Sequence, residues 1–161
     1  MINESFDCIL FLDIDGVMIP ATQLLVNPNS GWDRIFPATT IAVLNEICKI
    51  TKAKVVFNTT HNQKAKDVPD IEIALVNHGF KAEYIHPTDY KTLYPTFTRA
   101  EAIQEWLLRH PEVGDKWVAL DDVICAEYTH MVQVSTSGGL NVDNANHVIN
   151  ILGGQMIIML M

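Results

Sequence analysis

The sequence is poor in cysteine, in positive charge and in long hydrophobic runs, and each shortage excludes a class of protein. Its three cysteines, Cys8, Cys48 and Cys125, show no C-x-x-C spacing, so neither a disulfide framework nor a zinc knuckle is predicted. The chain has 11 Lys and Arg against 19 Asp and Glu, and its net charge of -8 argues against binding long nucleic acid, which relies on clustered cations. No apolar run approaches a membrane span in length, and residues 1–7 lack the pattern of a signal peptide.

The remaining composition is typical of a folded globular domain. Hydrophobic residues make up 48% and charged ones 19%, a balance that excludes an intrinsically disordered chain. The 161 residues suffice for one well-buried core, so we predict a single domain over residues 1–161. Cys8 and Cys48 fall in apolar stretches, which favours buried, unreactive thiols. This cysteine usage fits a reducing, cytoplasmic location.

The stretch CILFLDIDGV, residues 8–17, is the most informative part of the chain. An unbroken apolar run over residues 8–12 is typical of a strand covered on both faces. Side chains two apart on a strand point the same way, so Asp13 and Asp15 can converge on one ligand if strand geometry persists through both. Gly16 lets the chain leave the strand sharply. Since open α/β sheets bind ligands at the carboxyl ends of their strands, the stretch indicates a metal and phosphate site.

The motif has three other interpretations. A calcium loop needs its glycine at position six and its glutamate at position twelve, whereas here Gly16 is fourth and Leu24 twelfth, so that interpretation fails. A D-x-D motif also serves metal-dependent sugar-nucleotide transferases, which we expect to need a larger chain. A plain strand-ending turn stays open on this motif alone, because Asp and Gly are common turn residues.

Short apolar segments alternate with amphipathic ones along the chain. Strands are predicted over residues 8–12, 54–57, 83–85, 116–120 and 131–134. Helices are predicted over residues 37–51, 70–77, 98–110 and 142–152. The second helix is closed by Gly79, and Thr98 with Glu101 forms a capping box for the third. This alternation predicts a three-layer α/β domain with a mainly parallel, five-stranded sheet.

Two segments fall outside the alternation of strands and helices. Residues 18–36 hold several Pro, Gly and Asn residues and are predicted to form a loop beside the candidate site, with a short hairpin at 24–26. The apolar tail Met156–Met161 is expected to add an edge strand or to seal a homodimer.

Polar side chains follow several predicted strands and begin one helix. They are Asp13 and Asp15, Thr59 and Thr60, Arg99, and Asp121 and Asp122. Because the carboxyl ends of parallel strands share one edge of a sheet, these groups can meet although they are distant in sequence. Carboxylate oxygens favour Mg²⁺, which binds one or two carboxylates together with substrate phosphate. No cluster of His and Cys competes for zinc.

Arg99 is placed against its local preference. It lies in the first turn of a predicted helix, where a cation is mildly unfavourable for the helix macrodipole. Such a placement indicates a functional reason, although a solvated surface arginine fits the same position.

Taken in order, these motifs resemble those of the haloacid dehalogenase (HAD) superfamily of phosphohydrolases. The first, D-x-D-G-V/T, is present at residues 13–17, and Thr59 or Thr60 supplies the second, a strand-ending Ser or Thr. Arg99 matches the third, a Lys or Arg that opens a helix, and residues 121–122 match the fourth, an acidic pair after a strand. The resemblance covers most of the chain.

The layout is similar, more narrowly, to small HAD domains of RNA-repair proteins. Their second motif usually reads S-S-S-W-R, whereas residues 58–62 here read N-T-T-H-N, so the Trp and the Arg are missing.

The resemblance implies a mechanism. Asp13 would attack phosphorus and form an aspartyl-phosphate, and Arg99 with Mg²⁺ would offset the charge of the transferring oxygens. Asp15 would protonate the leaving oxygen and then deprotonate the hydrolytic water. Either Thr59 or Thr60 would donate a hydrogen bond to the phosphate.

The same resemblance implies a set of metal ligands and a reaction type. The ion would be held by Asp13, the backbone carbonyl of Asp15, and Asp121 or Asp122. An acid two residues after the nucleophile separates phosphatases of the superfamily from its dehalogenases and phosphonatases. Asp15 therefore favours phosphate-ester hydrolysis.

The superfamily usually gates its site with an inserted cap domain, but neither residues 18–36 nor residues 86–97 have room for one. We therefore expect no large cap and an open pocket. Such a pocket suits a bulky phosphorylated substrate, such as a phosphoprotein or a nucleic acid end, or shielding by a second subunit.

Two other function classes were compared with the phosphatase. A regulatory module that keeps the fold without the activity is favoured by the altered second motif and stays an alternative. A phosphotransfer receiver domain does not fit, because its acidic pair ends the first strand and here the pair comes late, at residues 121–122.

Overall fold

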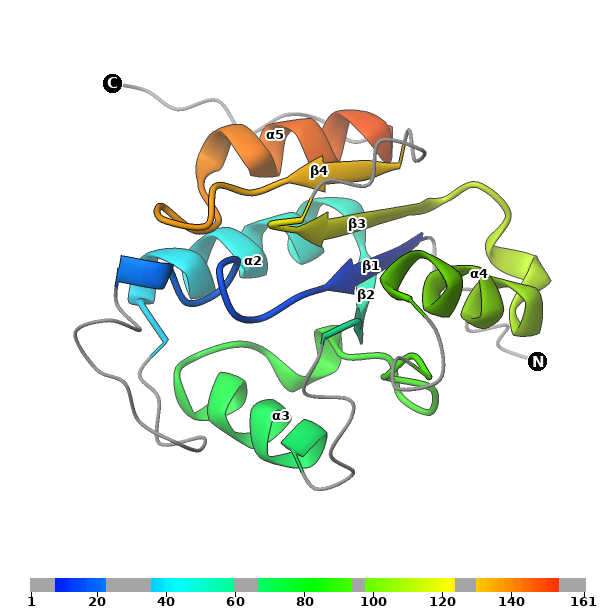
Figure 1. Ribbon diagram of the computed structural model, residues 1–161, viewed down its shortest axis with the longest axis horizontal. Coiled ribbons are helices and arrows are strands. Elements are labelled where there is room, and N and C mark those ends of the chain that lie inside the picture. The colour runs from blue at the N-terminus through cyan, green and yellow to red at the C-terminus, as the bar shows by residue number, and fades with distance from the viewer. Residues whose placement is uncertain (1–7, 23–35, 60–66, 94–97, 124–129, 154–161) are drawn as a thin grey trace.

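A parallel sheet forms the centre of the molecule. The computed structural model describes residues 8–22, 36–59, 67–93, 98–123 and 130–153. Within them, four strands have the order β2-β1-β3-β4, and they are β1 (Cys8–Leu12), β2 (Ala53–Phe57), β3 (Trp117–Asp121) and β4 (Met131–Gln133). The strand that precedes the D-x-D motif therefore lies inside the sheet, between β2 and β3 (Figure 1).

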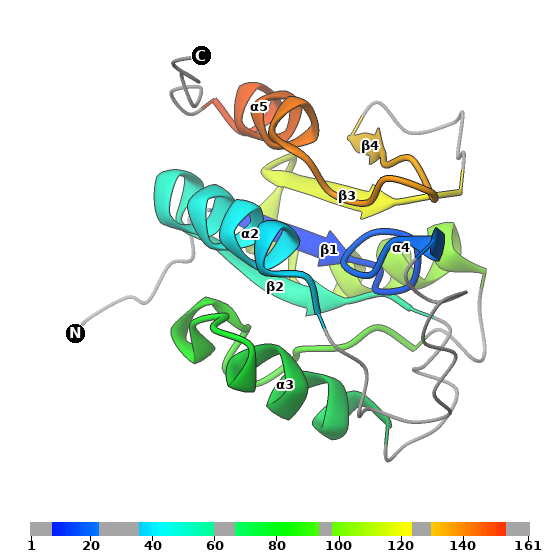
Figure 2. The ribbon, with the colours of Figure 1, turned by 90° about the vertical axis from the view of Figure 1, so that its left-hand side faces the viewer.

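Helices cover both faces of this sheet. They are α2 (Ala38–Thr51), α3 (Asp67–Asn77), α4 (Arg99–Arg109) and α5 (Val142–Ile151). In Figure 2, α2 and α5 lie in front of the sheet and α4 lies behind it. The predicted three-layer α/β fold with a parallel sheet is thus confirmed.

The alternation of side chains along β1 explains why both faces need a cover. Leu10 and Leu12 join the core beneath α2, α3 and α5, whereas Ile9 and Phe11 join the core beneath α4. Phe11 packs edge-to-face against Trp106 of α4, with ring centroids 5.3 Å apart. Every residue of β1 is buried, as its unbroken apolar run predicts.

The strand predicted over residues 83–85 is wrong. Ala82–Tyr84 form a 3₁₀ turn, and beyond it the chain meets β2 only through isolated bridges, one of them to Val55. The His86 N–H donates to the Val55 carbonyl at 3.0 Å. The Thr88 N–H, which would make the next bond of a parallel ladder, donates to His86 Nδ1 at 3.3 Å instead. The described sheet therefore has four strands, not five.

Local signals fix the ends of the helices nearest the candidate site. The side-chain oxygen of Thr98 accepts a hydrogen bond from the Glu101 N–H at 3.2 Å, so α4 begins where its cap predicts. The helix α3 begins at Asp67, earlier than the predicted residue 70. It is followed by Gly79 with a φ of +105°, the conformation for which a glycine was expected.

Some other predictions can be placed only in part. Cys8 and Cys48 are buried, as predicted. The hairpin at 24–26, Thr60 and the tail Met156–Met161 lie outside the described residues. In the described part of the chain, no helix has the length and apolar character needed to cross a membrane.

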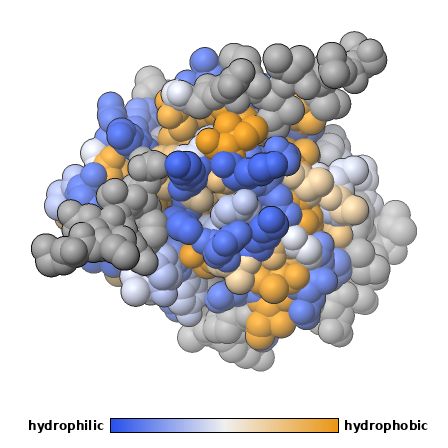
Figure 3. Space-filling view, turned by 180° about the vertical axis from the view of Figure 1, so that it is seen from behind, coloured by the Kyte–Doolittle hydropathy of each residue, from blue (hydrophilic) through white to orange (hydrophobic). Residues whose placement is uncertain are grey.

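Exposed apolar side chains are dispersed over the surface. The large ones come from α3, from α4 and from the connections: Ile73, Val76, Leu93, Leu108 and Val123. Figure 3, which shows the molecule from behind, has several hydrophobic areas separated by hydrophilic ones. Scattered apolar residues of this kind are normal on a globular protein.

Candidate active site

The register of the sheet brings two acids of distant sequence together. Leu12 pairs with Leu120 in the parallel ladder of β1 and β3. The Asp13 N–H donates to the Leu120 carbonyl at 3.1 Å, which extends this register by one residue. Asp13 and Asp121 therefore occupy neighbouring positions at the carboxyl edge. Odd-numbered residues of both strands face α4, so both acids point toward that helix.

A third acid completes a cluster at this edge. Asp13, Asp121 and Asp122 each place one carboxylate oxygen within 4.8 Å of those of the other two. The first two side chains are buried and Asp122 is half-buried. Three carboxylates that share one small volume repel one another unless a cation lies among them. The cluster therefore could hold a metal ion, and its oxygen donors are those that Mg²⁺ prefers.

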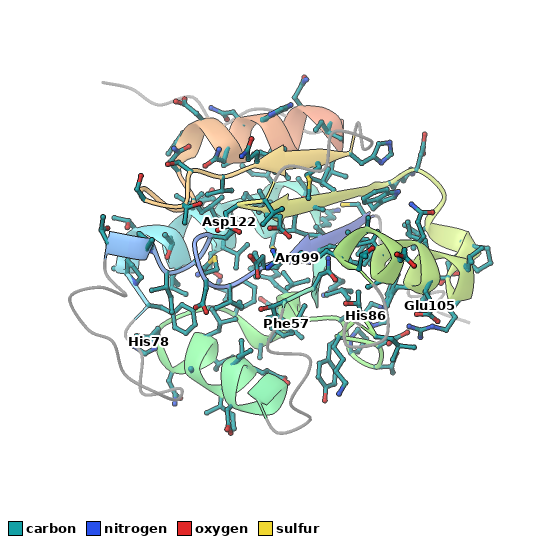
Figure 4. The ribbon with its side chains drawn as sticks, in the orientation of Figure 1. Phe57, His78, His86, Arg99, Glu105 and Asp122 are labelled. Carbon is teal, nitrogen blue, oxygen red and sulfur yellow. The ribbon has the colours of Figure 1, made fainter. Side chains whose placement is uncertain are left out.

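Arg99, the first residue of α4, directs its guanidinium into this cluster. Its Nη1 lies 3.0 Å from Asp13 Oδ2, donates to Asp121 Oδ1, and lies 3.8 Å from Asp122 Oδ1. Figure 4 shows Arg99 and Asp122 beside each other at the centre of the molecule. The guanidinium is a single positive charge facing three carboxylates, so the group keeps an excess of negative charge.

Burial raises the pKa values of the two buried acids of the cluster. Burial, reinforced by the charge of Asp121, raises the pKa of Asp13 to about 7, although Arg99 opposes the shift. Burial also raises the pKa of Asp121, again against the effect of Arg99. One arginine therefore does not suffice to keep this cluster fully ionised. A divalent cation would supply the missing positive charge, so the donor set fits Mg²⁺.

Gly16 allows Asp122 to reach the cluster. Its φ is +83°, and a Cβ atom at this position would lie 2.3 Å from Asp122 Oδ2. The glycine N–H donates to the Ile19 carbonyl at 2.8 Å and closes a turn directly after β1. A side chain at residue 16 would therefore displace the carboxylate of Asp122, in addition to straining the backbone.

Asp15 is not among the three acids whose carboxylate oxygens lie within 4.8 Å of one another. Strand geometry ends at Leu12, so the condition for Asp13 and Asp15 to converge along one extended strand is not met. Asp15 is half-buried in the turn that follows. Its roles as acid, base and backbone ligand of the metal stay predictions.

The end of β2 contributes polar groups to the same edge. Thr59 is buried two residues beyond the strand, which is where the second motif was expected. Asn58, which sequence analysis left without a role, donates from Nδ2 to the Arg99 carbonyl at 3.4 Å. Its Oδ1 accepts a hydrogen bond from the buried Thr92 hydroxyl at 2.7 Å. Asn58 and Thr92 therefore tie β2 to the start of α4, the residue that carries the guanidinium.

Thr136 and Gln133 were also missed by sequence analysis. The Thr136 hydroxyl donates to Asp122 Oδ2 at 3.2 Å, and Gln133 Nε2 donates to the Asp122 carbonyl at 3.4 Å. Both residues lie at the carboxyl end of β4, on the edge where the acids gather. Thr136 could have been found by the same strand-end pattern as the acids, because the hydroxyl-rich segment 135–137 directly follows the predicted strand 131–134; Gln133 lies inside that strand and carries no such signal.

The fold and the site together define an α/β domain whose acids and arginine gather at the carboxyl edge of a parallel sheet. Residues 9–145 match the family described as the HAD domain in Swiss Army Knife RNA repair proteins. The match spans most of the chain, so the protein belongs to this family of HAD domains. The predicted membership of the HAD superfamily is thereby confirmed. This superfamily is a phosphatase-type hydrolase family. No curated protein and no solved structure matches the chain.

Proposed function

We propose that this protein is a Mg²⁺-dependent phosphatase that hydrolyses a phosphate monoester through an aspartyl-phosphate on Asp13. The observation that carries the proposal is the cluster of Asp13, Asp121 and Asp122 around the single guanidinium of Arg99. An anionic nucleophile attacks an anionic substrate only where positive charge masks both. The site offers one fixed cation and a donor set suited to a second.

Each residue then has a role that fits its position. The Asp13 carboxylate forms a bond to phosphorus while the bond from phosphorus to the leaving oxygen breaks. Asp15 gives its proton to that oxygen, and Arg99 donates hydrogen bonds to the transferring oxygens. Asp13, the Asp15 carbonyl, and Asp121 or Asp122 would hold Mg²⁺, which supplies positive charge at the phosphate when bound. Either Thr59 or Thr60 donates its hydroxyl hydrogen to the phosphate.

Water completes the turnover. Asp15, now ionised, takes a proton from the water that attacks phosphorus, and the bond from phosphorus to Asp13 breaks. The products are inorganic phosphate and the free Asp13 carboxylate. Because Asp15 is half-buried rather than buried, it can exchange protons with solvent between turnovers.

The substrate is proposed only as a class. A phosphate monoester on a bulky group, a phosphoprotein or a nucleic acid end, fits a chain without room for a large cap. The RNA-repair proteins in the family's description favour the nucleic acid end. The net charge of -8 argues that such a substrate would be bound at its end and not along its length.

A phosphate-release screen with and without Mg²⁺ tests the proposal. Wild-type protein is expected to release phosphate from at least one monoester only when Mg²⁺ is present. The Asp13→Asn variant, which keeps the shape and removes the nucleophile, is expected to release none. Asp115→Asn is the matched control, because it removes an exposed carboxylate before β3, at the opposite end of the strand from the cluster.

The screen also separates the proposal from its alternative. Wild-type protein that binds Mg²⁺ but hydrolyses none of the esters would support a regulatory module and contradict the phosphatase.

A further inference from the structure

A polar hollow lies beside the acidic cluster. It has a volume of about 580 Å³ and is lined by Gln133, Val134, Ser135, Thr136 and Ser137. These residues contribute three hydroxyl groups and one amide, and none of the five is charged or aromatic. The hollow opens at the carboxyl end of β4, the edge of the sheet that also carries the acids.

Hydrogen bonds join this hollow to the cluster. Thr136 lines the hollow and donates to the carboxylate of Asp122 at 3.2 Å. The Val134 N–H donates to the Asp121 carbonyl at 2.8 Å. A substrate whose phosphate lies at the acids therefore has the hollow as an immediate neighbour. A second hollow, of about 560 Å³, is lined by Lys54, Glu83, His86 and others, none of which belongs to the cluster.

The wall of the polar hollow is fixed by hydrogen bonds of its backbone. The Thr136 carbonyl accepts from the Ala21 N–H at 2.8 Å, and the Ser137 carbonyl accepts from the Thr22 hydroxyl at 3.2 Å. The Ser135 carbonyl accepts from the Gly139 N–H at 2.8 Å. A ligand would therefore meet a wall that is already ordered, and binding would not have to order it.

The chemistry of the wall selects a kind of ligand. Ser135 and Ser137 lie 3.2 Å apart between their hydroxyl oxygens, and one of their two hydrogens suffices for that bond. Hydroxyl and amide groups both donate and accept hydrogen bonds, as the hydroxyls of a sugar do. An alkyl group in the hollow would remove these groups from water without replacing their hydrogen bonds. A charged group would find no opposite charge among the lining side chains.

We propose that this hollow is the leaving-group subsite of the enzyme and takes a polyhydroxylated group, such as a sugar or a ribose ring. The inference rests on the proposed phosphatase activity and adds the substrate class to it. Ser135 and Ser137 bind hydroxyls of the leaving group, and Thr136 links the subsite to Asp122.

Matched pairs of phosphate esters test the subsite. Glycerol 1-phosphate and n-propyl phosphate share a three-carbon chain and differ by two hydroxyls, and ribose 5-phosphate pairs likewise with cyclopentylmethyl phosphate. We expect kcat/KM to be about tenfold higher for the hydroxylated member of each pair, as a pair of net hydrogen bonds would give. The double variant S135A/S137A is expected to bring that ratio close to one. Thr88→Ala, which removes an exposed hydroxyl near Pro87, is the control and keeps the ratio.

The outcomes separate this inference from the proposed function. Equal kcat/KM within each pair, or an unchanged ratio in the double variant, would overturn the subsite and leave the phosphatase standing. Absence of release from every ester at all Mg²⁺ concentrations would overturn both. Comparison of ribose 5-phosphate with a short oligoribonucleotide that carries a terminal phosphate then distinguishes a free sugar from a nucleic acid end.

Discussion

At the scale of single residues, the site depends on contacts that a motif does not display. The D-x-D-G motif indicates Asp13 as a ligand, but the reason for its glycine emerges only with Asp122 in place. From the sequence, Gly16 is expected to let the chain leave the strand sharply. The structure adds that the carboxylate of Asp122 occupies the space where a side chain would be. Gly16 and Asp122 are far apart in the sequence, so no local sequence pattern predicts this contact.

Substitution of Gly16 separates these two roles. Gly16→Ala is expected to destabilise the fold by about 1–2 kcal/mol because an L residue is strained at positive φ. It is also expected to weaken Mg²⁺ binding and phosphate release, because Asp122 Oδ2 lies 2.3 Å from the added carbon. Gly153→Ala is the control, since Gly153 has a φ of +79° and nothing within 4 Å of the added carbon.

Thermal unfolding and a calorimetric Mg²⁺ titration check this prediction. Both variants should unfold at lower temperature than the wild type, and only Gly16→Ala should lose affinity for Mg²⁺. Equal affinity in the two variants would contradict the role given to the contact with Asp122.

At the scale of elements, the position of Arg99 depends on how α4 is joined to β2. The capping signal of Thr98 predicts where the helix begins, and this prediction is confirmed. The signal says nothing of which strand the helix start meets. In the structure, Asn58 at the end of β2 donates a hydrogen bond to the Arg99 carbonyl, and the Thr92 hydroxyl donates to Asn58. Thr92 lies in the connection before α4, where the sequence has no motif that predicts this contact.

The contact between Thr92 and Asn58 gives a prediction about this element. Thr92→Val keeps the shape but leaves Asn58 Oδ1 buried without its 2.7 Å partner, which is expected to cost about 1–3 kcal/mol of unfolding free energy. Because the start of α4 is then held less firmly, kcat is expected to fall more than KM rises. Urea unfolding and steady-state kinetics measure the two effects.

The control for this variant is Thr88→Val, at an exposed position of the same connection. It should change neither the unfolding free energy nor kcat appreciably. A stable Thr92→Val protein with normal kcat would show that α4 is positioned by its apolar packing, through Ile103 and Trp106, without this hydrogen bond.

The limits of prediction from sequence also become visible at this scale. The strand at residues 8–12 was predictable because its apolar run is long and unbroken. The segment 83–85 has too short a pattern to distinguish a strand from a turn. The hydrogen bond from the Thr88 N–H to the His86 ring, which takes the place of the next ladder bond to β2, has no signal in the sequence. Asp13 and Asp15 were expected to converge along one strand only if strand geometry persisted through both, and where a strand ends depends on tertiary contacts that its sequence does not contain.

At the scale of the whole molecule, strand order determines which residues meet. With the order β2-β1-β3-β4, β1 has a neighbour on each side. The residues that follow β2, Asn58 and Thr59, therefore lie on one side of the end of β1, and Asp121 of β3 lies on the other. The alternation of strands and helices predicts that such an edge exists. The register that places Asp13 beside Asp121, and not one residue away, follows from the packing of both faces of the sheet.

Concentrating acids at one edge makes the stability of the whole molecule depend on pH and metal. In the absence of divalent cations the pKa of Asp13 is about 7, above the ordinary value of 3.8 that it has in the unfolded chain. The folded state then binds more protons between these values, so this group's contribution to stability is fully present below pH 3.8 and is lost as pH rises through 7. Asp121 shifts in the same direction and adds to the effect.

Urea unfolding of metal-free protein between pH 4.5 and 8 measures this contribution as the difference between wild type and Asp13→Asn. We expect the wild type to lose stability relative to the variant as pH rises, since both keep Asp121 but only the wild type must also ionise the buried Asp13 carboxyl group. Saturating Mg²⁺ favours the ionised cluster, so it should stabilise the wild type at pH 8 and reverse that trend. The opposite result would be a stability difference between wild type and Asp13→Asn that does not change with pH, together with unchanged wild-type stability in Mg²⁺. It would mean that Arg99 alone neutralises the cluster and that the site does not bind a metal ion.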